Sequence, residues 1–263
     1  MAGVAAIGSA QYTAHRVPDG VPSATGVQRT SGSFVSQHRG GARTGWTIAT
    51  PRGHGSPLPV LIALHGRGQD HRYAFDSLYL DRFLAAAGQH GTVPFAIASV
   101  DGGDHSYWHP RRDGDPTGMV VDEFLPVLTE QGLAVARIGL LGWSMGGYGA
   151  LYLAGVLGPG RVAVVVAESP AMWHQAGQSA GGAFDDAADF DAHSIFGHLD
   201  RLRGIPARID CGSSDGFAPI TRDLRAALSP VPAGGIEPGG HDAKYWRSQA
   251  AAQLRFAGAQ LTG

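Results

Sequence analysis

Residues 138–151 read IGLLGWSMGGYGAL, and this stretch decides the fold. Its apolar start, Ile138–Leu141, predicts a strand buried in a parallel sheet, and the small residues from Met145 onward predict a helix. Between them lies a Gly-x-Ser-x-Gly motif with Ser144 at its centre. On such a sharp strand-to-helix turn the serine hydroxyl stands clear of the sheet edge, and only glycine leaves room for the neighbouring elements. Ser144 is therefore the candidate nucleophile; the alternative is a glycine-rich turn that happens to hold a serine.

Strand-like and helix-like segments alternate outward from this stretch in both directions. Apolar runs, typical of strands buried on both faces, occur at Val60–Leu64, Phe95–Val100, Ile138–Leu141 and Val162–Ala167. A further strand is expected at Ala207–Cys211. Apolar residues at helical spacing predict helices at about Phe75–Phe83, Val120–Leu128, Met145–Leu157, Ile220–Leu228 and Asp242–Ala257. Nearer the N-terminus, Ser33–His38 and Thr44–Thr50 flank a Gly-Gly pair and predict a β-hairpin. The pattern predicts an α/β fold with a mostly parallel central sheet, an N-terminal antiparallel hairpin and helices on both faces.

The length of 263 residues is typical of one large domain preceded by a short extension. Residues 1–30 are expected to form an irregular lead-in, and residues 31–263 the domain. A stretch rich in glycine and aspartate at about 173–204 interrupts the alternation, and we expect an insertion that acts as a lid or binding loop, or else a surface excursion without function.

Residues 1–10 are small and apolar, but they carry no positive charge and are short for a signal peptide. We expect the tail of a trimmed signal, which favours secretion or the cell envelope over the cytoplasm; a disordered start is the alternative.

The composition excludes several classes of function. The net charge is −2 and no block of Lys and Arg occurs, so neither a nucleic acid nor an anionic membrane is expected as a partner. Cys211 is the only cysteine, which excludes an intrachain disulfide and a cysteine-rich metal cage. No apolar run reaches the roughly 18 residues of a membrane-spanning helix, so no transmembrane segment is expected.

A serine hydroxyl becomes a nucleophile when a histidine takes its proton and an acid orients that histidine. In folds with this motif the chain order is serine, acid, histidine. Asp215 follows a predicted strand, at the carboxyl end where open α/β sheets place their sites, and His241 lies in a glycine-rich loop before the last helix. Glu168, after the preceding strand, is the second candidate for the acid, whereas Asp210 lies inside its strand and is expected to point into packing. No other histidine competes well with His241.

An oxyanion hole requires two backbone N–H groups that point at the developing negative charge. Met145, directly after the serine, is expected to supply one of them. The other is expected from the loop Leu64-His65-Gly66-Arg67-Gly68, where glycines let the backbone approach a ligand. Arg67 is the preferred donor and Gly66 the alternative, and we expect His65 to hold this loop in place rather than to titrate in catalysis.

Four motifs, LHGRGQD, GWSMGGYGALYLA, CGSSDGF and PGGHDAKYW, together resemble the putative-esterase family of α/β-hydrolases. The resemblance runs from about Ser31 to the C-terminus. The family includes S-formylglutathione hydrolases of the esterase D type and the secreted mycolyltransferase antigens of mycobacteria. The resemblance implies an α/β-hydrolase fold, a triad of Ser144, Asp215 and His241, and an oxyanion donor at Arg67.

The chain also departs from both of these subgroups. His65 stands where the mycolyltransferases have an aspartate, and Trp143 stands where esterase D has a histidine, so neither substrate carries over. The implied function is hydrolysis of a small-molecule or lipid ester through an acyl-enzyme, with no cofactor. Two alternatives stay open: acyl transfer to a sugar or lipid alcohol, and a non-catalytic binding role on the same scaffold.

Tryptophans lie near the predicted site in sequence, and ligand pockets are mostly apolar. The candidates for an acyl pocket are Trp108, Trp143, Trp173 and Trp246. Ordinary core packing explains each of them nearly as well.

Two patterns bear on metal binding. His105 and His109 are spaced i, i+4, but no helix and no H-E-x-x-H motif accompanies them. The acidic residues of the insertion lack the regular spacing of a calcium loop, so a solvated loop is expected at Asp185, Asp186, Asp189 and Asp191. No metal site is therefore expected.

Overall fold

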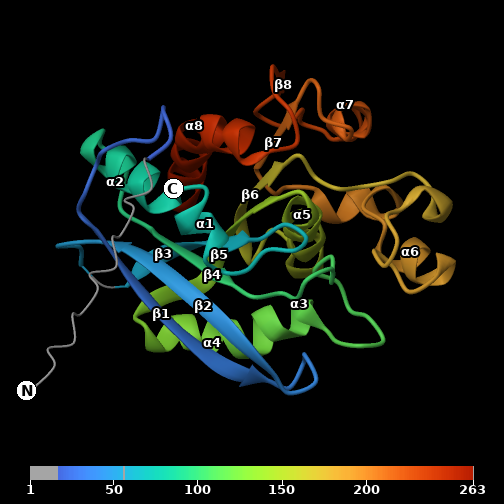
Figure 1. Ribbon diagram of the computed structural model, residues 1–263, viewed down its shortest axis with the longest axis horizontal. Helices are drawn as coiled ribbons and strands as arrows, with labels where there is room; N and C mark the ends of the chain where they lie inside the picture. Colours follow the sequence, from blue (N-terminus) through green and yellow to red (C-terminus); the bar gives the residue numbers. More distant parts are fainter. Residues whose placement is uncertain (1–16, 56, 263) are drawn as a thin grey trace, which may run out of the picture.

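The computed structural model describes residues 17–55 and 57–262, which contain one eight-stranded sheet (Figure 1). Its strand order is β1-β2-β4-β3-β5-β6-β7-β8. The β1/β2 and β2/β4 pairs are antiparallel and every other pair is parallel. The strands are β1 (Val27–Ser36), β2 (Ala42–Pro51), β3 (Leu58–Leu64), β4 (Ala96–Val100), β5 (Leu133–Trp143), β6 (Val162–Glu168), β7 (Ala207–Gly212) and β8 (Ile236–Glu237). The predicted α/β fold with its N-terminal hairpin is confirmed.

Helices cover both faces of this sheet, as Figure 1 shows. The α-helices are α1 (Tyr73–Asp76), α2 (Leu80–Gln89), α3 (Pro116–Gly118), α4 (Leu125–Glu130), α5 (Met145–Leu157), α6 (Ala187–His193), α7 (Ala218–Ala227) and α8 (Ala243–Leu261). A π-helical turn, η1 (Met119–Phe124), and two 3₁₀ segments, η2 (Ala176–Gln178) and η3 (Phe196–Leu202), complete the set.

The unbroken apolar run of β3 is explained by two separate hydrophobic cores. Val60, Ile62 and Leu64 pack into the core that contains α4 and α5, whereas Leu61 and Ala63 pack into the core that contains α2 and α8. Successive side chains of a strand point to opposite faces of the sheet, so a strand covered on both sides is apolar at every position.

The turn between β5 and α5 is packed too tightly for side chains at its glycines. A Cβ atom on Gly142 would overlap the carbonyl of Gly146, and one on Gly146 would overlap the carbonyl of Leu64 at the end of β3. Both obstacles are backbone atoms, which cannot move aside as a flexible side chain can. The glycines of the motif therefore allow helix α5 to begin directly against the sheet.

Replacing Gly146 with alanine is expected to lower the free energy of unfolding by about 3 kcal/mol, because the new methyl group must displace main chain in a close-packed turn. Urea unfolding followed by circular dichroism measures the change. The matched control is Gly160→Ala, since a Cβ atom at Gly160 meets nothing within 4 Å. Equal stability of the two variants would contradict the packing account.

The N-terminal hairpin is longer than predicted. β1 begins at Val27 rather than at Ser33, so part of the expected lead-in at residues 1–30 belongs to the sheet. Most residues of β1 are exposed, and hydrogen bonds to β2 hold the strand, so no apolar pattern marks its start. Residues 1–16, including the expected signal remnant, lie outside the described residues. Within the described part, no helix combines the length and apolar character needed to cross a membrane.

Two predicted helices are interrupted. The one expected at Phe75–Phe83 is divided into α1 and α2, because Tyr79 takes a left-handed backbone conformation with φ 55°. The one expected at Val120–Leu128 changes from the π-helical turn η1 to α4, and the change falls next to Pro126, which has no N–H to donate. Short strand β8 was not predicted, since two residues carry no periodicity.

The stretch at about 173–204 has more secondary structure than its composition suggests. It contains η2, α6 and η3 and lies beside α5 (gold in Figure 1). Phe184, Phe190 and Ile195 pack against one another or against the main core, so the segment is anchored by apolar contacts despite its many glycines and aspartates. These contacts were not predicted, because the many glycines and aspartates leave no apolar periodicity in this segment.

Candidate active site

Ser144 occupies the strained position of the turn between β5 and α5. Its φ of 55° and ψ of −122° lie outside the regions that an L-residue favours. Backbone hydrogen bonds hold this conformation: its N–H donates to the carbonyl of Glu168 over 2.9 Å, and its own carbonyl accepts from the N–H groups of Tyr148 and Ala171. The hydroxyl is thereby kept at the carboxyl end of the parallel strands.

His241 and Asp215 come from two further loops at this same end of the sheet. Nε2 of His241 lies 2.9 Å from Oγ of Ser144, and Nδ1 of His241 lies 2.8 Å from Oδ2 of Asp215. The N–H of Phe217 donates to the other carboxylate oxygen of Asp215 over 2.9 Å. Burial alone would raise the pKa of Asp215, but hydrogen bonds from His241, Phe217 and Ser169 outweigh it and lower that pKa. Asp215 is thus kept ionised beside the histidine.

Glu168, the second candidate for the acid, lies in a different environment. Its side chain is buried, and burial together with the charge of Asp210 raises its pKa well above the usual value. Within the described residues no hydrogen bond joins Glu168 to His241. Its carbonyl, rather than its carboxyl group, supports the turn at Ser144. Asp210, as expected, points into packing, where it meets Arg208 and Gln253.

The two N–H groups expected to form an oxyanion hole are available. In residues 17–55 and 57–262, neither Met145 nor Arg67 has an acceptor for its backbone N–H. The N–H of Gly66, the alternative donor, is engaged with Oε1 of Gln69 over 3.0 Å. The same Gln69 oxygen accepts from Nε1 of Trp143 over 2.6 Å. Gln69 was not singled out in the sequence, because nothing there shows that its side chain folds back onto its own loop.

His65 lies under the same loop and is completely buried. Its Nδ1 is 2.8 Å from the carbonyl of Gly66, and its Nε2 accepts from the N–H of Gly102 over 2.9 Å. Burial lowers its pKa, so the ring stays neutral. His65 therefore fastens the loop after β3 to the loop after β4.

The candidate tryptophans divide into buried and accessible ones. Trp108, Trp143 and Trp246 are buried, and each donates its indole N–H to a protein acceptor. Trp246 also packs edge-on against His241, with ring centroids 5.2 Å apart, and this contact helps to hold the imidazole ring in place. Only Trp173 is partly exposed. Core packing rather than pocket lining explains the first three.

A row of aromatic rings starts at His241 and runs onto the insertion. Phe217 lies 5.4 Å from His241, Trp173 lies 5.8 Å from Phe217, and Tyr107 lies 5.6 Å from Trp173 (centroid distances). Phe184 contacts both Tyr107 and Trp173. We call Tyr107, Trp173, Phe184 and Phe217 the aromatic row. Only Trp173 had been singled out, because these rings come from separate loops.

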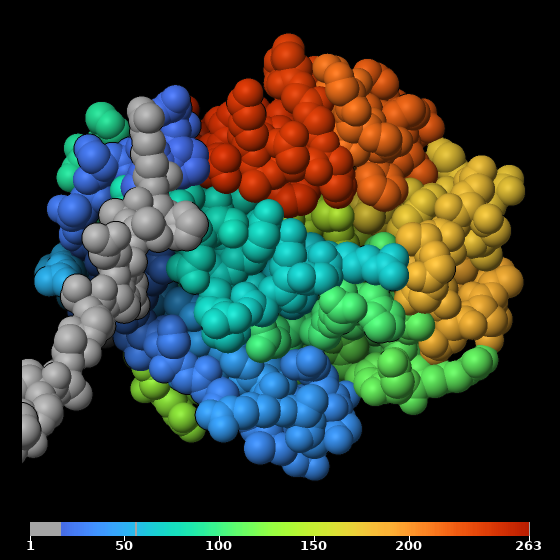
Figure 2. Space-filling view, viewed as in Figure 1, coloured from blue at the N-terminus to red at the C-terminus, as the bar shows by residue number. Residues whose placement is uncertain are grey.

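The space-filling view shows a hollow on the face that carries these loops (Figure 2). The loop after β3 (cyan), the C-terminal segment (red) and the insertion (gold) border it. These are the segments that contribute Arg67, His241 and Trp173.

Asp101, directly after β4, joins β2 to the loop after β3. Its carboxylate accepts from the N–H of Gly45 over 3.0 Å, and from the N–H and Nδ1 of His71 over 2.7 and 2.8 Å. Burial would raise the pKa of Asp101, but the hydrogen bonds from His71 and Gly45 outweigh it and lower that pKa to about 2.

A carboxylate whose pKa is lower in the folded than in the unfolded state stabilises the fold at every pH at which it is ionised. The contribution of Asp101 is complete above its unfolded pKa of about 3.9 and is lost as the pH falls towards about 2. Because the group is partly exposed, we expect Asp101→Asn to cost about 1–2 kcal/mol at pH 6. Urea unfolding at pH 6 and pH 3 should show this cost shrinking at the lower pH. A cost that is independent of pH would assign the effect to packing instead.

The family described as "Putative esterase" matches residues 39–257 of the chain. No curated protein matches its sequence. Among solved structures, it is similar to a ferulic acid esterase, with 18% identity, a TM-score of 0.78, and 90% of this chain and 99% of that chain covered. It is also similar to FphF, a fluorophosphonate-binding serine hydrolase of Staphylococcus aureus, with 20% identity and a TM-score of 0.71. The match covers 91% of this chain and 100% of FphF. An S-formylglutathione hydrolase from Agrobacterium tumefaciens is similar too, with 17% identity and a TM-score of 0.73. The match covers 90% of this chain and 96% of that hydrolase.

Proposed function

The chain belongs to the family described as putative esterase, and on this premise we propose that it hydrolyses carboxylic esters through an acyl-enzyme on Ser144. The observation that carries the proposal is the unbroken line of hydrogen bonds from Asp215 through His241 to Ser144. Nδ1–H of His241 donates to ionised Asp215, which leaves the lone pair of Nε2 to accept the serine proton.

In the first half of the reaction, His241 takes the proton of Ser144 as the hydroxyl oxygen attacks the ester carbonyl. Negative charge then develops on the carbonyl oxygen. The backbone N–H groups of Met145 and Arg67 are the donors that stabilise it, and the positive end of helix α5 adds to them. His241 returns the proton to the leaving alcohol.

In the second half, water takes the place of the alcohol. His241 removes a proton from this water, which attacks the acyl carbonyl and releases the acid from Ser144. Asp215 keeps the imidazole in the tautomer that both halves need. No cofactor takes part in either half.

The aromatic row supports a preference for esters of aromatic acids. Three of its rings, Trp173, Phe184 and Phe217, are partly exposed, and the row begins at the catalytic histidine. Flat rings offer a large apolar contact at little cost in conformational entropy. We propose that an aromatic acyl group packs along this row while its carbonyl lies at Ser144. Similarity in fold to a ferulic acid esterase agrees with this preference.

The proposal is tested with a panel of esters and a covalent probe. A fluorophosphonate should label one residue, Ser144, identified by peptide mass spectrometry. The purified chain should hydrolyse p-nitrophenyl acetate, and methyl cinnamate esters should have the higher kcat/KM. Addition of glycerol or trehalose tests the transfer alternative, because an acyltransferase would form the new ester instead of the free acid. Absence of both labelling and hydrolysis would refute the esterase assignment.

A further inference from the structure

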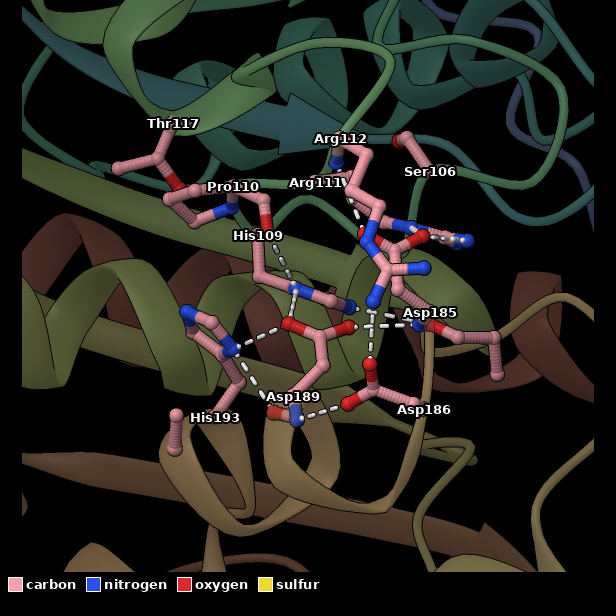
Figure 3. A network of polar contacts seen from close by, with 12 residues as sticks. Ser106, His109, Pro110, Arg111, Arg112, Thr117, Asp185, Asp186, Asp189 and His193 are labelled. Carbon is pink, nitrogen blue, oxygen red and sulfur yellow. Dashed lines mark hydrogen bonds and ion pairs between the residues drawn. The ribbon is translucent and has the colours of Figure 1, made fainter.

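Two histidines and an aspartate meet where the insertion touches the main domain, and none of them is part of the hydrogen-bonded line at Ser144. His109 comes from the loop after β4, and Asp189 and His193 lie one turn apart on helix α6 of the insertion. Figure 3 shows the three side chains pointing toward one another. Their ligand-type atoms all lie within 4.8 Å of one another. This combination was not predicted, since the three residues become neighbours only when the insertion folds onto the domain.

The distances among these atoms are close to those between the ligands of one small divalent cation, and Nδ1 of His193 also lies 2.8 Å from the carbonyl oxygen of Asp189. Oδ1 of Asp189 lies 2.8 Å from Nδ1 of His193 and 3.9 Å from Nδ1 of His109. Ligands of tetrahedral zinc at about 2.1 Å from the metal are about 3.4 Å from each other, which lies between these two values. Two imidazoles and one carboxylate form a donor set that zinc and its neighbours in the transition series accept, with water as a fourth ligand.

The environment of His109 provides an independent reason for a cation. Its Nε2 lies 3.0 Å from the carbonyl of Ala183, and its Nδ1 lies 3.0 Å from the carbonyl of Pro110. Both carbonyls can only accept a hydrogen bond, and a neutral imidazole carries only one N–H. With the hydrogen on Nε2, the lone pair of Nδ1 faces oxygen atoms in a fully buried place. A cation bound by Nδ1 and Asp189 removes this conflict.

The surroundings also orient the carboxylate as metal ligands are usually oriented. Oδ2 of Asp189 accepts from the N–H of Asp185 over 2.8 Å, which leaves Oδ1 directed at the two histidines. The nearby arginines do not neutralise it, because Arg111 pairs with Asp185 and Arg112 pairs with Asp186. The side chain of His193 is 18% exposed, so an ion from solvent can reach the cluster.

We propose that His109, Asp189 and His193 bind one divalent transition-metal ion of the zinc type. The ion would tie the insertion to the loop after β4. That loop carries Tyr107, and Phe184 of the insertion stacks on His109 with ring centroids 4.9 Å apart, so the ion would hold part of the aromatic row in place. Its role is structural and no step at Ser144 passes through it.

The test uses the full-length chain without a histidine tag, treated with EDTA and dialysed. Isothermal titration with ZnCl₂ should show one ion per chain, and saturating zinc should raise Tm by about 5 °C. CoCl₂ should give the visible absorption bands of cobalt bound to nitrogen and oxygen ligands. His193→Ala and Asp189→Asn should lose the binding, the Tm increase and the cobalt spectrum.

The matched control is His105→Ala. His105 lies four positions before His109, but its side chain is 49% exposed and belongs to no such cluster, so this variant should bind zinc as the unmodified chain does. Fluorophosphonate labelling of Ser144 reports folding in every variant, and its absence in the unmodified chain would count against the proposed function and not against zinc binding. No binding of one ion per chain, or equal binding in His193→Ala, would overturn the proposal.

Discussion

Replacing Ser144 with alanine is expected to reduce kcat for ester hydrolysis by about 10⁴- to 10⁶-fold. The variant loses the only atom that can form the acyl-enzyme, and His241 is left with no proton to take. The fold should remain, because Ser144 is held by its backbone N–H and carbonyl and alanine keeps both hydrogen bonds. Alanine also tolerates the positive φ no worse than serine does.

Initial rates with p-nitrophenyl acetate measure the loss of activity, and urea unfolding should give the same midpoint for the variant and the unmodified chain. Ser213→Ala is the matched control, since Ser213 is an exposed serine in the loop that carries Asp215. The control should retain full activity. If Ser144→Ala turned over the ester at the unmodified rate, the nucleophile would have to be another residue.

Replacing Asp215 with asparagine is expected to lower kcat/KM by about 10⁴-fold. The amide group can donate to Nδ1 of His241, which reverses the hydrogen bond and places the imidazole hydrogen on Nε2. In that tautomer Nε2 cannot accept the proton of Ser144. The change in shape is small, so packing around position 215 should be preserved.

Glu168→Gln is the control for this second experiment. Burial raises the pKa of Glu168 well above its usual value, and glutamine keeps the shape of this side chain without a charge. We expect kcat/KM of this variant to stay within about threefold of the unmodified chain, as is usual for a residue that contacts no reacting group. Full activity in Asp215→Asn together with a large loss in Glu168→Gln would exchange the roles of the two acids.

Most of the fold could be read from the sequence because its signals are local. Buried parallel strands are apolar at every position, and helix α5 was predicted with the bounds that the structure gives it, Met145–Leu157. Gly142 and Gly146 mark the turn at Ser144, since the backbone itself excludes side chains there. The misplaced boundaries occur where local signals are weak. β1 is held by hydrogen bonds to β2 rather than by burial, and Tyr79 breaks a helix that its spacing favoured.

The sequence by itself determined the strand–turn–helix at Ser144 and placed Asp215, Glu168 and His241 in the chain order of a hydrolase. Only the tertiary structure decided which carboxyl group meets His241, because Asp215 and Glu168 both lie at the carboxyl ends of parallel strands. The side chain of Asp215 contacts His241, whereas that of Glu168 is buried beside Asp210. It also decided that Gln69 occupies the N–H of Gly66 and that His109 meets Asp189 and His193. Each of these contacts depends on where a loop folds back, and a loop carries no periodic pattern from which its path could be read.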